Sequence, residues 1–199
     1  MTGTLLAMMM LGGLSNEAHA TRAGGGLNVG TMVMPGLYPV RFPNQVRNNE
    51  DTGIEKIRGD GHFGLEGAYF LGDEHRIGAA ATLGFGSGYF DRSFMLKYDY
   101  VIGLEGAEVL LGGGLGVGRN TFNGEDTEQL DLPYYPLRVE AGPMLNQGFL
   151  AEQVMLYAQY NIPSRGTYTG LDGVEVDAGP GVFMTIGAEL IVMFGNFER

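Results

Sequence analysis

The sequence of 199 residues contains no cysteine and no tryptophan. Without cysteine it can form no disulfide, hold no metal ion through thiolates and carry no lipid on an N-terminal cysteine. It also lacks a long apolar run, because glycine or a charged residue interrupts every stretch that approaches the roughly 20 residues of a transmembrane helix. These absences disfavour a disulfide scaffold and a helical membrane protein.

Basic residues are scarce as well. The chain has 12 Lys and Arg against 23 Asp and Glu, which gives a formal net charge of −11. Because nucleic acid attracts proteins through clustered positive charge, this balance argues against a nucleic-acid partner.

The first 20 residues have the pattern of a secretory signal peptide. An apolar run covers residues 5–11, and the segment ends in Ala18-His19-Ala20, a small-x-small cleavage pattern. The segment carries no Lys or Arg at its start, although signal peptides normally do. We therefore predict a signal peptide over 1–20 and an exported domain over 21–199, whose formal charge is 12 − (23 − 1) = −10.

Residues 182–194 alternate in character. One face is apolar, whereas the other carries Thr185, Gly187 and Glu189. Such period-two alternation is typical of a strand that separates an apolar from a polar environment. It occurs both in a membrane barrel and in a soluble sandwich, so strand length and connection length have to decide between them.

The same alternation recurs along the chain. Segments of this kind, bounded by turn residues, predict eight strands at 26–37, 62–71, 76–87, 93–103, 107–118, 134–145, 151–162 and 181–194. Most are close to the about 9–11 residues that a tilted transmembrane strand needs.

The connections between these strands alternate in length. Those at 72–75, 104–106 and 146–150 are short, those at 38–61, 119–133 and 163–180 are long, and 88–92 is a short connection on the long-loop side. An up-and-down barrel with both termini in the periplasm has short periplasmic turns and longer external loops. The alternation of short and long connections therefore predicts an all-β, eight-stranded, antiparallel up-and-down transmembrane β-barrel.

The two faces of the predicted strands agree with this fold. We assign one face to lipid: Ile77, Ala79, Ala81, Leu83, Phe85, Tyr98, Tyr100, Ile102, Leu137, Val139 and Ala141. Aromatic residues are expected to form one girdle near the loops (Phe63, Phe85, Phe94, Tyr135, Tyr160 and Phe183) and a second near the turns (Tyr69, Tyr100 and Phe194). A soluble barrel or sandwich is the alternative, but its surface would consist of glycine and alanine where charged residues are usual.

The pattern of strands and loops resembles the small eight-stranded outer-membrane β-barrels of the OmpX, OmpW and OmpA-transmembrane type. The resemblance covers 21–199 and implies an outer-membrane location. Members of these families usually end in a strand with a closing aromatic residue, and Met184, Ile186, Ala188, Leu190, Val192 and Phe194 supply that register. The chain continues for five residues beyond Phe194.

The polar face predicts a charged network inside the barrel. Its members are Glu66, Lys97, Asp99, Glu108, Arg138, Glu140, Tyr157 and Glu189. Counting across the turn near residue 147 sets Arg138 opposite Tyr157 and Glu140 opposite Met155. Charges in a narrow lumen must pair or be hydrated, so the network either fills the lumen or lines a cation-preferring path.

A catalytic site has weaker support. His62 lies two residues from Asp60, and the expected hairpin brings it near Ser87, which are the residue types of an acyl hydrolase or acyltransferase. No motif accompanies them, and Ser87 and His62 fall on opposite faces. We predict no catalytic residues, no cofactor and no metal site.

The sequence therefore predicts a monomeric outer-membrane barrel with a structural or loop-mediated role at the cell surface. The expected surroundings are outer-membrane lipid and lipopolysaccharide, and an extracellular partner would bind loops 38–61, 119–133 and 163–180. The alternative is a narrow pore or conduit for small or apolar solutes, of the OmpW kind. A lipid A-modifying enzyme is the third possibility.

Overall fold

The structure is a computed structural model that describes residues 22–37, 40–42, 45–47, 58–86, 88–123, 129–170, 173–178 and 183–198. The predicted signal peptide at 1–20 lies outside these residues. In the described residues no helix is long and apolar enough to cross a membrane.

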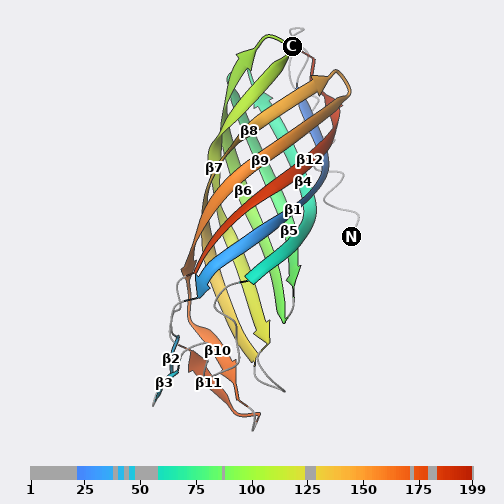
Figure 1. Cartoon of the computed structure of the whole chain (residues 1–199). Helices are drawn as coiled ribbons and strands as arrows, with labels where there is room; N and C mark the ends of the chain where they lie inside the picture. Colours follow the sequence, from blue (N-terminus) through green and yellow to red (C-terminus); the bar gives the residue numbers. More distant parts are fainter. Residues whose placement is uncertain are drawn as a thin grey trace, which may run out of the picture.

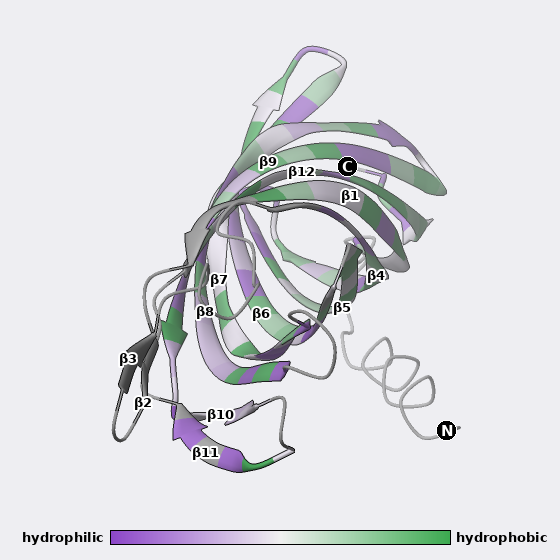
Figure 2. Ribbon diagram, turned by 60° about the horizontal axis from the view of Figure 1, so that its bottom comes forward, coloured by the Kyte–Doolittle hydropathy of each residue, from purple (hydrophilic) through white to green (hydrophobic). Residues whose placement is uncertain are grey.

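Within this part of the chain, eight long strands close into an antiparallel barrel (Figure 1). They are β1 (Ala23–Leu37), β4 (Arg58–Leu71), β5 (His75–Gly86), β6 (Tyr89–Leu104), β7 (Ala107–Asn123), β8 (Gln129–Gln147), β9 (Leu150–Pro163) and β12 (Phe183–Asn196). Each pairs with the next, and β1 pairs with β12, from Ala23 opposite Asn196 to Leu37 opposite Phe183. This last pairing removes both sheet edges, as the predicted fold requires. Viewed from the loop end, the strands curve round in a ring, with β9, β12 and β1 across from β6, β7 and β8 (Figure 2).

The three short connections lie at one end of the barrel, as predicted. Each contains a glycine with positive φ: 67° at Gly72, 80° at Gly106 and 70° at Gly148. Side chains with a Cβ are strained in this conformation, which explains glycine at these tight turns. We call this the turn end, and the opposite end, with the longer connections, the loop end.

The predicted connection 119–133 is largely strand, and here the prediction was wrong. β7 continues to Asn123 and β8 begins at Gln129. The alternation inverts in this part, because Phe122, Leu130 and Leu132 are buried inside while polar Thr121 and Gln129 lie on the outward parity. Beyond the membrane, the barrel wall has the pattern of a soluble sheet, with apolar residues inward.

Short strands also occupy the other two long connections. β2 (Val40–Phe42) pairs with β3 (Gln45–Arg47), and β10 (Gly166–Thr169) pairs with β11 (Glu175–Ala178). β10 also extends the barrel sheet, since Thr167 pairs with Asp131 on β8. This hairpin is therefore attached to the wall by backbone pairing.

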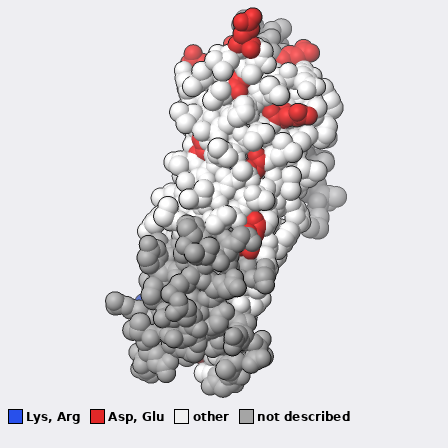
Figure 3. All heavy atoms as spheres, in the orientation of Figure 1, with Lys and Arg blue, Asp and Glu red and all other residues white. Residues whose placement is uncertain are grey.

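The outer surface of the barrel is apolar. All the side chains assigned to lipid face outward, and several are strongly exposed, for example Val139 at 66% and Leu137 at 47%. Of the expected girdle residues, Phe63, Phe85, Phe94, Tyr135, Tyr160, Tyr100 and Phe194 are exposed and Tyr69 is half-buried, whereas the side chain of Phe183 is outside the described part. On the face shown in Figure 3 most of the wall is uncharged. So continuous an apolar surface fits lipid and excludes the soluble alternative.

Glycines on the inner face leave room for large neighbours. A Cβ on Gly118 would overlap the ring of Tyr134, and one on Gly187 would overlap the ring of Tyr157. Small residues therefore occur where a bulky side chain of the adjacent strand lies across the lumen.

Residues 195–198, which follow Phe194, complete the turn end. Phe194 is 51% exposed to the outside, whereas Phe197 is 1% exposed and packs edge-on against Phe70, with ring centroids 6.3 Å apart. The backbone N–H of Phe197 donates to the carbonyl of Gly148 at 2.8 Å. The tail thus turns inward and closes this end of the barrel.

Candidate functional site

A chain of ion pairs crosses the lumen. On the turn side, Arg76 donates to Asp99 at 3.0 Å and also pairs with Glu66. Lys97 joins Glu66 to the next carboxylate, since its Nζ lies 3.1 Å from Glu66 and 2.7 Å from Glu140. All five side chains are at most 1% exposed.

Arg138 continues the chain on the loop side. Its Nη1 lies 3.5 Å from Glu140 and pairs closely with Glu189, and its Nε donates to Gln159 at 3.2 Å. Its guanidinium also stacks over the ring of Tyr157, 3.8 Å from the centroid. Planar guanidinium groups favour such combined pairing and stacking. Arg138 is therefore held on four sides.

The network draws on six strands of the described barrel: β4, β5, β6, β8, β9 and β12. β7 contributes no charged side chain to the network and has glycines beside it instead. Its Gly112 pairs with Asp99 and Glu140, and Gly114 pairs with Lys97 and Arg138. Because these two positions lack side chains, the long charged groups of β6 and β8 can meet across them.

Glu108 belongs to a second, separate cluster at the turn end. It accepts hydrogen bonds from Arg22 at 2.7 and 2.9 Å and from Asn146 at 2.8 Å. The guanidinium of Arg22 lies 4.1 Å from the centroid of the Phe70 ring. The structure therefore does not bring Glu108 together with the other seven predicted residues.

An apolar layer lies next to this cluster inside the barrel. Its buried residues are Ala68, Phe70, Val101, Leu110, Met144, Ala151, Met155, Ile191, Met193 and Phe197. They come from β4, β6, β7, β8, β9, β12 and the tail. The turn end of the lumen thus holds an apolar layer beside the buried pair of Arg22 and Glu108.

The predicted cross-strand partners of Arg138 and Glu140 were wrong by two residues. Arg138 pairs with Gln159, and Glu140 pairs with Tyr157. The turn lies at Gly148 and Phe149, one residue later than assumed. A shift of two residues in the pairing register leaves each side chain on the same face of the sheet, so Tyr157 still points inward.

Sequence reasoning missed Arg76 and Arg22. Arg76 directly precedes Ile77 on the same strand, so the alternation that assigned Ile77 to lipid already placed Arg76 on the inward face. Arg22 precedes the first predicted strand, which begins at 26, and no pattern in the sequence indicates its pairing with Glu108.

His62 faces the lumen, where its Nε2 lies 3.8 Å from Glu189. Ser87, the third member of the hypothetical catalytic set, lies outside the described residues. Of the residues that are described, no three His, Asp or Glu side chains lie close enough to hold a metal ion. His62 thus adjoins the charged network on its loop side.

Solved structures of similar shape include an outer membrane protein and a surface protein. The outer membrane protein OprG from Pseudomonas aeruginosa aligns with 14% identity and a TM-score of 0.50, covering 88% of this chain and 98% of its own. Neisserial surface protein A aligns with 11% identity and a TM-score of 0.48, covering 87% and 99%. No protein-family profile and no curated protein sequence matches the chain.

The chain is a closed, eight-stranded antiparallel β-barrel with the fold of OprG. The similarity to OprG supports the fold, and the exposed apolar wall independently requires lipid around it.

Proposed function

We propose that this protein is a non-enzymatic, monomeric barrel that presents its loops at the cell surface and does not conduct through its lumen. The observation that carries the proposal is the chain of ion pairs from Asp99 to Glu189 together with the apolar layer at the turn end. The signal-like segment at 1–20 would export the chain to the outer membrane.

The energetics of the network favour a closed lumen. Removing one partner of a buried ion pair costs about 3–5 kcal/mol, because the remaining charge is left without compensation. Lys97 and Arg138 each contact more than one carboxylate, so opening a water path would disturb several pairs together.

A narrow pore or conduit remains the alternative function. The network holds four carboxylates (Glu66, Asp99, Glu140 and Glu189) against three cations (Arg76, Lys97 and Arg138), so an open path would favour cations. Conduction would also require Phe197 and its neighbours to leave the turn end. The packing of the apolar layer supports the non-conducting role instead.

The loop end supports a role in presentation. β7 and β8 carry the barrel sheet past the apolar belt, and the hairpin of β10 and β11 is paired to β8. Loop residues attached to these strands project from a rigid scaffold, and barrels and sandwiches commonly present binding loops in this way. An extracellular partner would meet the loop end, at the segments 38–61, 119–133 and 163–180, while outer-membrane lipid and lipopolysaccharide surround the wall.

The proposal can be tested in cells without knowing the partner. A deletion strain is complemented with the wild-type chain, with a chain whose residues 164–182 are replaced by a short Gly-Ser linker, or with Glu189→Gln. We expect the loop-replaced chain to fold, as shown by heat-modifiable gel migration, but to leave the deletion phenotype uncorrected. Glu189→Gln should restore the wild-type phenotype.

The opposite pattern would support the conduit. If the loop-replaced chain complements fully while Glu189→Gln changes the uptake of small or apolar solutes, the function resides in the lumen and the proposal is wrong.

A further inference from the structure

Basic side chains are almost absent from the outward face of the barrel. Among the described residues of the eight wall strands, Arg92 on β6 and Arg119 on β7 are the outward-facing basic residues. They are register partners, so their Cα atoms lie directly opposite each other across the two strands. The only two outward cations of the described wall therefore form one adjacent pair.

The position of this pair is unfavourable in a plain hydrocarbon environment. Along β6, Arg92 lies between Phe90 and Phe94, which are 39% and 46% exposed. On the neighbouring strand, Leu83 pairs with Arg92 and is 38% exposed. A guanidinium on the lipid face destabilises a barrel unless it reaches a polar or anionic group. Its position near the loop end places that group in the outer leaflet.

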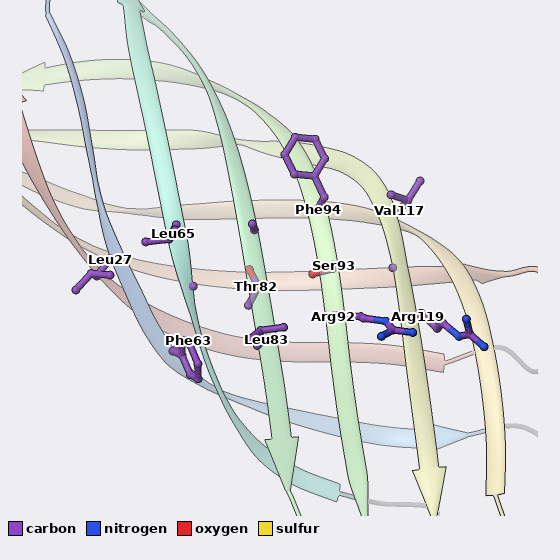
Figure 4. Close-up of a pocket in the computed structure, with 13 residues that line it drawn as sticks. Leu27, Phe63, Leu65, Thr82, Leu83, Arg92, Ser93, Phe94, Val117 and Arg119 are labelled. Carbon is purple, nitrogen blue, oxygen red and sulfur yellow. The ribbon is translucent and has the colours of Figure 1, made fainter. Parts of the chain in front are cut away.

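An apolar groove lies beside the two arginines on the outer wall. It has a volume of about 760 Å³ and extends from Leu27 on β1 to Val117 on β7 (Figure 4). Its floor includes Ala81, a small outward residue paired with Leu65 on one side and Phe94 on the other. In Figure 4, Arg92 and Arg119 lie at one side of the groove, on the loop-end side of Phe94 and Val117.

We propose that this groove is a binding site for a phosphorylated lipid of the outer leaflet, namely lipid A. Its phosphate binds Arg92 and Arg119, and one acyl chain lies over Ala81 between Leu65 and Phe94. Guanidinium groups bind phosphate oxygens through charge-assisted hydrogen bonds, and the groove supplies the apolar contact that an acyl chain requires. The site is on the outer wall and is independent of the role proposed for the lumen and loops.

Asp131 orients one of the two arginines. The Nε of Arg119 donates to its Oδ1 at 2.7 Å, and Nη2 pairs with Oδ2. Arg92 has no ion-pair partner in the part of the chain that is described, so the cluster of Arg92, Arg119 and Asp131 keeps a net positive charge. That charge is available for an anionic headgroup.

The charge also argues against a second copy of the chain in this groove. A two-fold contact sets the same patch against itself, so it would bring the arginines of both copies together and be repulsive. A phosphorylated lipid satisfies both the cations and the apolar groove.

Native mass spectrometry of the refolded chain in neutral detergent tests the proposal. The added lipids are diphosphorylated lipid A, the same lipid after removal of its phosphates, and zwitterionic phosphatidylcholine. We expect one lipid A molecule to bind at least tenfold more tightly than either comparison lipid. R92Q/R119Q should lose this preference, and Ala81→Phe should weaken lipid A binding while keeping both arginines.

Arg165→Gln is the matched control, because Arg165 is an exposed cation in the connection between β9 and β10. It should bind lipid A like the wild type, and heat-modifiable migration confirms that each variant is folded. Equal lipid A binding by R92Q/R119Q and R165Q would overturn the site. Equal binding of the phosphorylated and dephosphorylated lipids would overturn the role of the arginines.

Discussion

Arg138 is the residue on which the loop side of the lumen network depends. It contacts Glu140, Glu189, Gln159 and the ring of Tyr157, and its own side chain is 9% exposed. Sequence alternation predicted that this side chain points inward. It could not predict how many partners share it, because this depends on the register of three strands.

Replacing Glu189 by Gln should destabilise the folded barrel by about 3–5 kcal/mol, since Arg138 would lose the carboxylate it pairs with most closely. The measurement is the urea midpoint of the barrel refolded in lipid vesicles. Glu105→Gln, in the exposed turn between β6 and β7, removes the same charge from a solvated site and should change the stability little. Equal midpoints for the two variants would contradict a structural role for the pair.

Gly187 is expected to tolerate no branched side chain. A Cβ there would meet the ring and hydroxyl of Tyr157, so Gly187→Val should cost about 1–3 kcal/mol by overpacking the lumen. Ala188→Val adds methyl groups to the neighbouring outward position and should be almost neutral. The same urea titration checks both, and a neutral Gly187→Val would show that the lumen has free space beside Tyr157.

At the scale of the elements, period-two alternation predicted all eight wall strands, because each wall strand separates lipid from a polar lumen. It failed at the loop ends of β7 and β8, where Phe122, Leu130 and Leu132 point inward and the wall no longer faces lipid. The short strands β2, β3, β10 and β11 were missed because three or four residues carry too little alternation to be recognised.

The register error at Arg138 has a different origin. Alternation repeats every two residues, so it fixes which face a side chain occupies but leaves shifts of two residues undetermined. Only the turn at Gly148, with its positive φ, sets the pairing of β8 with β9.

The tail after β12 should contribute more to stability than its position at the end of the sequence suggests. Phe197 is buried in the apolar layer, so Phe197→Ala should cost about 3–5 kcal/mol. Phe194→Ala removes the same ring from the lipid-facing side, where Phe194 is half exposed, and should cost clearly less in the same unfolding assay. A larger loss for Phe194→Ala would mean that the tail does not seal the turn end.

At the scale of the whole molecule, the barrel places its charges inside and hydrocarbon outside, which is the reverse of a soluble protein. The charges of the lumen network are paired, an apolar layer lies at the turn end, and the wall continues beyond the lipid belt to support the loops. We therefore propose that the barrel is a closed scaffold with its function on the outside.

Single-channel conductance of residues 21–199, refolded into a planar lipid bilayer, tests this claim most directly. Heat-modifiable migration of the same preparation shows that the barrel is folded. The folded wild-type barrel should pass no discrete current. Reproducible, cation-preferring steps from the wild-type barrel would contradict it and would make the charged network a permeation path.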